Sequence, residues 1–530
     1  QLAVDEKKAN GKRGSLTIEL KNIAKEQLAD TPLAKNKKAQ VTYDYLPLDI
    51  MVPYACADVH YTLLLYKRYA HAVLQDTALR GLYAVEQALT KALFDVEHHG
   101  VKVDVPYLLE LGPKLEKQSD EFAQKVYSEV GYEFNIGSDP QLIEAFKKAG
   151  VRLTKITKGS KKKIQAGADP STAQFSVDAD VLEGLASQYH FAQEVLNYRG
   201  VCKLKGTYVD GALKLRDSND YIHTTFNQNV RTGRMSSKEP NIQNIPNRDN
   251  RIRRAFINPF IDEYVFVFID YSQIELRLTA HCSQDPALLA CYPFRGEGTD
   301  VHSLTTAEVV MDVPYQQVLS MKGDKTGHDK TNPMCDCPSC LVKFFRTIAK
   351  RVNFGIIYGA QAPTIQRQVS TPQRPVTKED CQTYIDKYLE KYKGVNDWIH
   401  ATHRYLAYYK QVQNAFGRYR RFPELKDKKL PSWQRERCER QAVNFLIQGA
   451  AADLFKTAIV RVHKLLAKHK ARTKLVNFVH DEMQFYWHRD EIALLAEVKK
   501  EMEDFDFTVP IIAEVAYSKT DWSTKKELSE

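Results

Sequence analysis

Two apolar runs that end on acidic residues constrain this sequence more than any other feature. Residues 264–269 form a continuous run of β-branched and aromatic side chains that ends on Asp270. This pattern is typical of a strand buried on both faces. Residues 474–487 hold two more such runs on either side of Asp481 and Glu482, which predicts a hairpin with its carboxylates at the turn.

If these strands are neighbours in one sheet, carboxylates 211 residues apart in the sequence come together. Two close carboxylates repel each other unless cations lie between them, and oxygen ligands with open positions suit Mg²⁺ that also carries substrate phosphates. A pair of such ions can stabilise the attacking and leaving oxygens in phosphoryl transfer. An Asp after a strand is more often a helix cap or a turn former, so this signal is weak by itself.

The composition narrows the class of protein. A length of 530 residues is enough for three or four domains, and hydrophobic and charged fractions of 43% and 27% are typical of soluble globular proteins. The net charge of +10 produces a field that attracts polyanions. Nine cysteines are too few for a disulfide scaffold and favour a reducing compartment. No apolar run reaches the ~20 residues of a membrane span, and no signal peptide follows Gln1, so we expect an intracellular protein without a membrane partner.

A second signal comes from residues 346–358. Arg346, Lys350, Phe354 and Tyr358 are each four residues apart, and such a stripe drifts by only roughly 40° per step on a helix. One helix face would then present two cations and two aromatic rings. Cations bind a triphosphate, and aromatic faces pack against a base. The alternative is a half-buried helix whose Lys and Arg extend their charged ends into solvent.

Together these segments resemble motifs A, B and C of the family A DNA polymerases. Residues 270–277 read Asp-Tyr-Ser-Gln-Ile-Glu-Leu-Arg, and residues 480–482 read His-Asp-Glu. Arg346 and Lys350, followed by Asn-Phe-Gly at 353–355, lie between them in the family's order. The likeness runs from about residue 86 to residue 522. Further segments similar to that family are residues 198–199, 203–204, 207–208, 232–237, 240–246, 448–449 and 452–453.

The resemblance implies an α/β (α+β) right-hand polymerase fold with thumb, palm and fingers, the palm built on an antiparallel sheet. The implied domains are a remnant of a 3′-5′ exonuclease domain at 1–75, a connecting helix at 76–104, the thumb at 105–215, the first part of the palm at 216–300, the fingers at 301–435 with an insertion at 323–340, and the second part of the palm at 436–530. Because the first residue is Gln rather than Met, we expect the numbering to begin inside a longer protein.

The same resemblance implies roles for individual residues. Asp270 and Asp481 would be the catalytic ligands of two Mg²⁺ ions, for which Mn²⁺ can substitute, with the Tyr271 carbonyl as a further ligand and Glu482 in support. Glu275 would exclude a ribose 2′-hydroxyl, a task that needs only a fixed bulky group. The implied nucleotide-binding residues are Gln273, Glu275, His302, Arg346, Lys350, Phe354 and Tyr358. The implied DNA-binding residues are Lys203, Arg234, Asn241, Gln243, Asn244, Gln448 and His480.

Some of these residues also have simpler interpretations that involve no catalytic or sequence-independent groove contact. Arg234 and Gln448 would read the minor groove near the primer end, where acceptors occur on every base pair. Arg234 could instead bind only phosphate, the commoner contact of arginines on DNA. Glu482 could be a solvated turn residue and His480 a structural histidine.

Residues 54–58, Tyr-Ala-Cys-Ala-Asp, resemble the last motif of the 3′-5′ proofreading exonuclease of this family. Tyr54 and Asp58 are four residues apart, on one face of a predicted helix. Such a nuclease needs further acidic metal ligands, which the sequence before Tyr54 does not supply convincingly. We therefore expect this remnant to be inert, and an amphipathic helix with a surface Asp is the alternative.

A polar insertion at 323–340 interrupts the family pattern. Its His328, Cys335, Cys337 and Cys340 could give four tetrahedral zinc ligands, although their spacing is not that of a common zinc finger. A loop without metal is the alternative. Its position before the nucleotide-binding helix favours contact with DNA or with an accessory partner.

The function that the resemblance implies is template-directed DNA synthesis in replication or repair, with primer-template DNA and deoxynucleoside triphosphates as partners and a processivity or replisome factor as a further candidate. We expect a cytoplasmic location in a bacterium or a phage-infected host, or an organelle. The alternatives are a single-subunit RNA polymerase, which should lack the gate at residues 273–275, and a DNA-binding accessory protein without activity. Asp270, Asp481 and Lys350 argue against the accessory protein.

Overall fold

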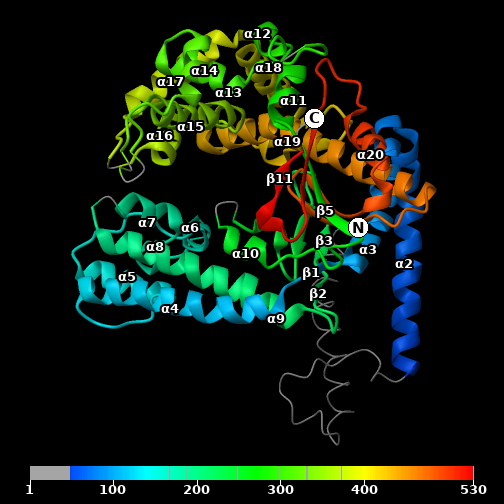
Figure 1. Ribbon diagram of the computed structural model, residues 1–530, viewed down its shortest axis with the longest axis horizontal. Helices are drawn as coiled ribbons and strands as arrows, with labels where there is room; N and C mark the ends of the chain where they lie inside the picture. Colours follow the sequence, from blue (N-terminus) through cyan, green and yellow to red (C-terminus); the bar gives the residue numbers. More distant parts are fainter. Residues whose placement is uncertain are drawn as a thin grey trace, which may run out of the picture. The chain divides into compact units, whose positions relative to one another are not determined.

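The computed structural model describes residues 48–528, apart from 166, 187, 247–248, 297, 330–331, 333 and 372. The chain divides into two compact units, Gln1–Gly81 and Leu82–Glu530. The lysine-rich residues 5–38, whose apolar spacing is helix-like, lie outside the described residues. Figure 1 labels the helices and strands.

The helices are α2 (Leu48–Gln75), α3 (Thr77–His99), α4 (Val105–Val130), α5 (Asp139–Lys148), α6 (Lys158–Gln165), α7 (Ala179–Ala186), α8 (His190–Lys203), α9 (Gly211–Leu215), α10 (Asn250–Arg254), α11 (Ile274–Ser283), α12 (Pro286–Leu289), α13 (Val301–Thr305), α14 (Tyr315–Gly323), α15 (Pro338–Ile357), α16 (Ala362–Val369), α17 (Lys378–Lys391), α18 (Lys393–Tyr409), α19 (Ser432–Lys468) and α20 (Leu494–Glu503). The strands are β1 (Val101–Lys102), β2 (Tyr221–Ile222), β3 (Thr225–Asn227), β4 (Ser236–Lys238), β5 (Tyr264–Tyr271), β6 (Gln411–Gln413), β7 (Tyr419–Arg421), β8 (Lys474–Val479), β9 (Glu482–His488), β10 (Ala513–Ser518) and β11 (Lys526–Glu527).

The second unit is built around a five-stranded sheet in the order β11-β10-β5-β9-β8, and all its neighbouring strands are antiparallel. The predicted strand at residues 264–269 is β5, its middle strand, and the predicted hairpin is β8 and β9. These observations confirm the α/β fold with an antiparallel central sheet.

The central strand is buried on both faces, as its sequence predicts. Val267 and Ile269 face one hydrophobic cluster, to which α11 and α19 contribute. Phe266 and Phe268 face another cluster, which includes Leu108 of α4. The alternation follows from the two-residue period of a strand. Because both faces are covered, the end of β5 is held firmly, and with it Asp270.

A helical layer, drawn in cyan and green at the lower left of Figure 1, follows the connection from α3. Its main helices are α4 and α8, which pack against each other, and α7 packs against α8. Asp104 caps α4, because its side chain accepts a hydrogen bond from the Tyr107 N–H at 3.0 Å. The helix ends at Gly131, whose φ of 86° suits a residue without Cβ. The cap and the glycine therefore explain where α4 begins and ends.

The helices α13 to α18 form the upper part of the second unit in Figure 1. The predicted cationic and aromatic face lies on α15, which begins with Pro338 directly after Cys337 and ends at Ile357. Gly359 follows with φ 66°, and a Cβ there would overlap the side chain of Arg440. A glycine is therefore required where the chain turns away from α15.

The basic, Gly-containing sequence of residues 155–163 predicts an exposed loop, and this prediction is wrong. Residues 158–165 form α6. Thr157 precedes the helix, and its hydroxyl accepts a hydrogen bond from the Ser160 N–H at 3.2 Å, so a local cap outweighs the unfavourable glycine.

Among the described residues, one helix, α19, is long and apolar enough by length and composition to cross a membrane. However, 78% of its most apolar stretch of 18 residues is buried inside the protein. It is thus better explained as a core helix, and it also packs against α11 and α18.

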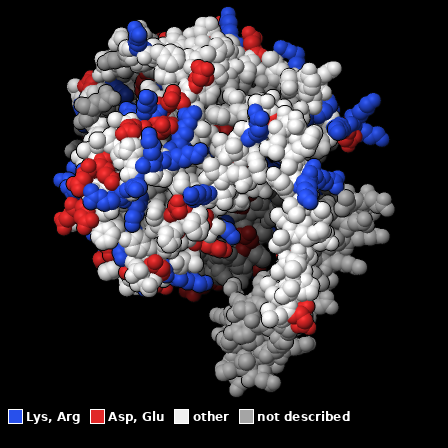
Figure 2. Space-filling view, turned by 90° about the vertical axis from the view of Figure 1, so that its right-hand side faces the viewer, with Lys and Arg blue, Asp and Glu red and all other residues white. Residues whose placement is uncertain are grey.

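On the face shown in Figure 2, basic and acidic side chains are interspersed.

Candidate active site

Acidic residues meet at one end of the central sheet. Asp270 lies near the end of β5, Asp481 lies between β8 and β9, and Glu482 begins β9. The antiparallel register pairs Asp270 with Glu482, so Asp481 lies next to that pair. His480 adopts φ 58° in the same turn and is exposed. The sheet therefore brings together the two predicted metal ligands, which are 211 residues apart.

Negative charge on the two aspartates is unfavourable in this site without a bound cation. Oδ1 of Asp270 is buried and has no hydrogen-bond partner within the described part of the chain. Burial, with the charges of Asp481 and Glu482, raises the pKa of Asp270 to about 8. Burial also raises the pKa of Asp481 to about 6. A divalent cation would relieve both shifts, so these residues fit the metal ions that the sequence predicts.

Glu482 is in a different electrostatic environment. Its Oε2 pairs with the Lys525 ammonium at 2.5 Å, and its Oε1 accepts a hydrogen bond from Gln484 Nε2 at 2.8 Å. The side chain is buried. Because its carboxylate already has a cation and a donor, Glu482 is better suited to supporting the site than to binding a metal directly. The backbone of Tyr271, the other predicted ligand, follows Asp270, and its buried hydroxyl donates to the Met502 carbonyl at 2.6 Å.

The cations of α15 differ in their contacts. Arg346 donates through a terminal nitrogen to Asp300 Oδ2 at 2.8 Å and through Nε to the Ser303 hydroxyl at 3.3 Å. Although burial opposes it, hydrogen bonds from Ser303 and Arg346 lower the pKa of Asp300 to about 2. Lys350 forms no hydrogen bond or ion pair with any described residue, and partial burial and the charge of Arg346 lower its pKa. Lys350 is therefore a cation available to an anionic ligand.

His302 lies beside this cationic face. The Asn353 amide nitrogen donates to its Nδ1 at 2.9 Å, and the Thr305 hydroxyl donates to the Asn353 amide oxygen at 2.9 Å, which fixes the amide orientation. Burial, with the charge of Lys350, lowers the pKa of His302 to about 4. The ring is neutral at pH 7, so its hydrogen is on Nε2, which can donate to a ligand. The Phe354 ring lies 5.6 Å from the His302 ring, centroid to centroid.

Glu275 contacts two other residues that have predicted roles of their own, Arg234 and Tyr358. Glu275 accepts a hydrogen bond from Arg234 at 2.5 Å through Oε1 and another from the Tyr358 hydroxyl through Oε2. Only 11% of the Glu275 side chain is exposed. Tyr358 is the C-cap of α15 rather than a residue within the helix, and Gln448 also contacts its hydroxyl. The carboxylate at 275 is therefore held rigidly between two chain segments.

A pocket opens beside Asp481 and contains several predicted DNA-binding residues. Its lining includes Arg234, Gln243, Lys456, His480 and Asp481. The other predicted DNA-binding residues, and Gln273, are not among its lining residues. Asn241 accepts from the Ser237 hydroxyl at 3.2 Å, Asn244 and Lys203 are exposed, Gln448 is half-buried on α19, and Gln273 accepts from the Tyr292 hydroxyl at 3.0 Å.

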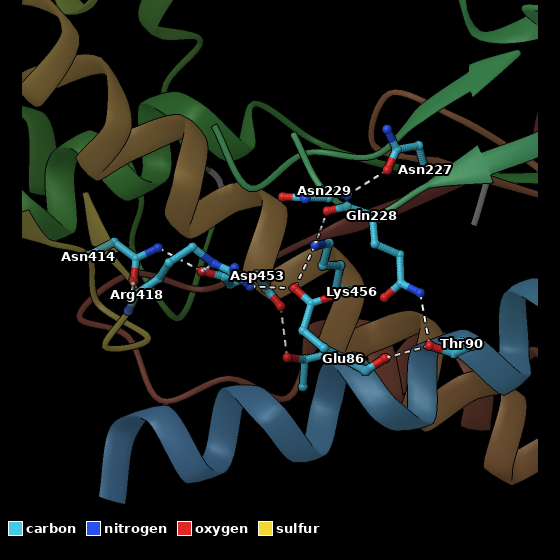
Figure 3. Close-up of polar contacts among 10 residues, drawn as sticks. Glu86, Thr90, Asn227, Gln228, Asn229, Asn414, Arg418, Asp453 and Lys456 are labelled. Carbon is cyan, nitrogen blue, oxygen red and sulfur yellow. Dashed lines mark hydrogen bonds and ion pairs between the residues drawn. The ribbon is translucent and has the colours of Figure 1, made fainter. Parts of the chain in front are cut away.

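A partly buried charge network beside this pocket was not anticipated from the sequence (Figure 3). Glu86 of α3 accepts from Lys456 Nζ at 2.7 Å and from Arg418 at 2.5 Å. Asp453 accepts from Arg418 Nε at 2.9 Å and from Asn414 at 2.7 Å. Only 1% of the Lys456 side chain is exposed. The network joins α3 and α19 to the loop between β6 and β7, and so fixes the wall of the pocket.

The remaining predicted residues lie elsewhere. The side chains of His328, Cys335 and Cys337, which precede α15, converge with that of Cys340 in its first turn. Asp58, the predicted exonuclease remnant, is exposed on α2 in the first unit, where Tyr54 is half-buried. The inertness of that remnant stays a prediction. Asp300 and Asn353 received no separate role from the sequence, although Asp300 has the signature of a helix N-cap and accepts from the His302 N–H at 3.1 Å.

Comparisons with known proteins agree with this geometry. The sequence model of DNA polymerase family A matches residues 105–326 and 338–524. DNA polymerase I of Chloroflexus aurantiacus is 33% identical over 487 residues, which are 89% of this chain and 46% of that protein. The thermostable DNA polymerase I of Thermus thermophilus is 33% identical over 451 residues, 84% of this chain and 48% of that protein. The chain thus spans about half the length of these curated relatives.

A solved structure is similar in fold. It is the POL domain of Pol1 from M. smegmatis in complex with DNA primer-template and dNTP. The superposition has a TM-score of 0.68 at 30% sequence identity and covers 83% of this chain and 70% of that one.

Proposed function

The chain belongs to DNA polymerase family A, and from this premise we propose that it extends a DNA primer on a template by adding deoxynucleotides to the 3′-hydroxyl. One observation carries the proposal. The register of β5 with β9 unites Asp270 and Asp481, and their raised pKa values call for a dication. Attack of the hydroxyl on the α-phosphate would release pyrophosphate, and catalysis would consist mainly of positioning and charge neutralisation.

Asp270, Asp481 and the Tyr271 carbonyl would hold two Mg²⁺ ions, and Mn²⁺ can substitute. When bound, the ions supply charge neutralisation at the attacking and leaving oxygens. Glu482 would support the site through its pair with Lys525. Family A polymerases are metal-dependent, and Mg²⁺ is the hard, oxygen-preferring ion that suits carboxylates and phosphates together.

The triphosphate would lie against α15. Lys350 offers an unpaired ammonium and His302 offers Nε2–H, so both can donate to phosphate oxygens without first breaking a contact to a described residue. Arg346 differs, because it must exchange its pair with Asp300 for the phosphate. Phe354, next to His302, and Tyr358 would pack against the incoming nucleotide.

Glu275 would select the sugar. Its side chain is nearly buried and held by Arg234 and Tyr358, and a rigid group can exclude a 2′-hydroxyl by contact alone. Gln273 would bind the nucleotide beside it. Arg234 and Gln448 would contact the minor groove at the primer end, with Asn241, Gln243, Asn244, His480 and Lys203 as further DNA contacts. In this assignment 105–215 is the thumb, 216–300 and 436–530 the palm, and 301–435 the fingers.

A primer-extension assay separates this function from its alternatives. The chain should extend a primer with dNTPs far faster than with rNTPs. A preference for rNTPs would favour an RNA polymerase, and DNA binding without extension would favour an accessory protein. The matched control is Asp490→Ala, which removes an exposed aspartate beyond the opposite end of β9 and should extend at the wild-type rate.

A further inference from the structure

The segment between α14 and α15, together with the first turn of α15, brings four side chains that can bind a metal close to one another. The ligand atoms of His328, Cys335, Cys337 and Cys340 all lie within 4.8 Å of one another. The Nδ1 atom of His328 is 3.5 Å from the Sγ atoms of Cys335 and Cys337 and 3.6 Å from that of Cys340. Among the described residues, this is the one group of three or more such side chains that converges in this way.

Hydrogen bonding does not explain this arrangement. Nδ1 has one site in the ring plane, as a donor or as an acceptor, so it cannot satisfy three sulfurs at once. A shared cation does explain it. A sulfur about 2.3 Å and a nitrogen about 2.0–2.1 Å from a tetrahedral zinc ion lie roughly 3.5 Å apart. The three observed distances match that value.

The surroundings favour anionic sulfur. Burial of Cys335 and Cys337 opposes their ionisation, but nearby backbone groups offset this cost. The Asp329 N–H points to Cys335 Sγ at 3.4 Å. Cys337 is the N-cap of α15, where the helix dipole stabilises a thiolate.

An arginine from a distant part of the chain supports the same segment. Arg374 donates to the Cys335 carbonyl at 2.9 Å and to Asp336 at 2.8 Å, and its guanidinium lies 5.0 Å from the centre of the Phe344 ring. Phe344 belongs to α15. Arg374 therefore fixes the cysteine segment against the helix that follows it.

We propose that His328, Cys335, Cys337 and Cys340 bind one structural Zn²⁺ ion. Three thiolates and one imidazole are a ligand set that selects zinc, and four protein ligands leave no open position for substrate. The family match omits residues 327–337, so three of the four ligands lie in a segment that the family pattern does not include.

The ion would fasten the first turn of α15 to the segment that follows α14. Two backbone-directed hydrogen bonds already join these parts, from Ser339 N–H to the Asp324 carbonyl at 3.0 Å and from the Ser339 hydroxyl to the Lys322 carbonyl at 2.9 Å. Arg346 and Lys350 lie further along the same helix. If the proposed function holds, zinc thus limits the movement of the residues that bind the triphosphate.

The test is the zinc content of the whole chain purified without added metal, measured by elemental analysis. We expect about one zinc per chain. Cys340→Ser and His328→Ala should each lose it. Cys202→Ser is the matched control, because Cys202 is also half-buried but lies outside the cluster, and it should retain zinc. Wild-type protein reconstituted with Co²⁺ should show the absorption of a tetrahedral thiolate complex.

A variant that fails to fold would also lose metal, so the wild-type protein is treated in parallel with a zinc-selective chelator. We expect zinc to leave with little loss of the far-ultraviolet circular dichroism signal, because most helices and the central sheet lie outside this segment. The KM for dNTP should rise a few-fold, with a smaller change in DNA affinity.

Three results would overturn the proposal: wild-type protein without metal, a disulfide among the three cysteines, or zinc that persists in both variants. Metal content does not depend on catalysis. Wild-type protein that holds zinc but fails to extend a primer would therefore reject the proposed function and leave the zinc site standing.

Discussion

The two candidate metal sites of this chain are built in opposite ways. Asp270 and Asp481 come from two strands 211 residues apart, and the register of a buried sheet holds them. The thiolate cluster comes from residues 328–340 and has little core of its own. A site held by a sheet keeps its shape whether or not a metal is bound, whereas a local cluster gains its order from the ion.

The two candidate metal sites also differ in the type of ligand that they offer. The carboxylates are hard ligands with room for substrate oxygens, which suits an ion that takes part in a reaction. The thiolates and imidazole can close a tetrahedron, which suits an ion that only holds structure. The comparison therefore predicts which changes affect catalysis and which affect local order.

The largest effect should follow from loss of a palm carboxylate. Asp270→Ala and Asp481→Ala should each lower primer extension by roughly a thousandfold or more, because each removes a predicted metal ligand. DNA affinity, measured by gel shift, should change little, since distributed basic contacts supply it. Cys340→Ser tests the comparison, because it should keep most of its kcat. An extension rate near wild type in either Asp variant would remove the metal assignment.

The second prediction concerns stability without divalent ions. Asp270→Asn should stabilise the protein by about 1–3 kcal/mol at pH 8, because the charged form of Asp270 is unfavourable in the folded state. The folded-state pKa lies above its unfolded value of 3.8, so the native state binds the extra proton. Wild-type stability should thus fall as pH rises from about 4 to about 8 through this group, and the gain in the variant should disappear below about pH 4.

The matched control carries the same substitution at Asp453. This carboxylate is satisfied by Arg418 and Asn414, and only 2% of its side chain is exposed (Figure 3). Asp453→Asn should therefore destabilise the protein, by roughly 3 kcal/mol, because it leaves Arg418 without its buried partner. Chemical denaturation in the presence of EDTA measures both variants. If both variants are more stable than the wild type, or both are less stable, then Asp270 and Asp453 do not differ in their electrostatic environments.

Substitution of Glu275 tests whether this carboxylate, which lies near the two aspartates, belongs to the metal site or selects the sugar. Glu275→Ala should raise the efficiency of rNTP relative to dNTP incorporation by roughly ten- to a hundredfold, because it removes the bulky group that would meet the 2′-hydroxyl. The Mg²⁺ concentration for half-maximal activity should stay the same. Single-nucleotide incorporation kinetics give both quantities. A change in Mg²⁺ dependence without a change in sugar selection would make Glu275 a ligand instead of a gate.

Much of this could be predicted from the sequence, where local patterns report burial. The two-sided burial of residues 264–269, the hairpin around Asp481 and the face of α15 all follow from periodicity. The family resemblance supplied the roles. The pairing of Arg346 with Asp300 and that of Lys456 with Glu86 could not be predicted, because contacts between distant segments leave no periodic signal.

The smallest effect we predict lies at the outer support of the cysteine cluster. Arg374→Ala should weaken zinc retention by about tenfold, because outer contacts orient the ligands of a metal without binding it. Its kcat should not change, since Arg374 contacts Cys335, Asp336 and Phe344 and none of the residues assigned to catalysis. Arg367→Ala is the control, because that exposed side chain has one long hydrogen bond, 3.5 Å to the Thr364 hydroxyl. Competition with a chromophoric zinc chelator measures the difference. If Arg374→Ala retains zinc as the wild type does, the four ligands alone order the cluster. If the variant loses extension activity instead, the two metal sites are coupled more closely than their separate construction implies.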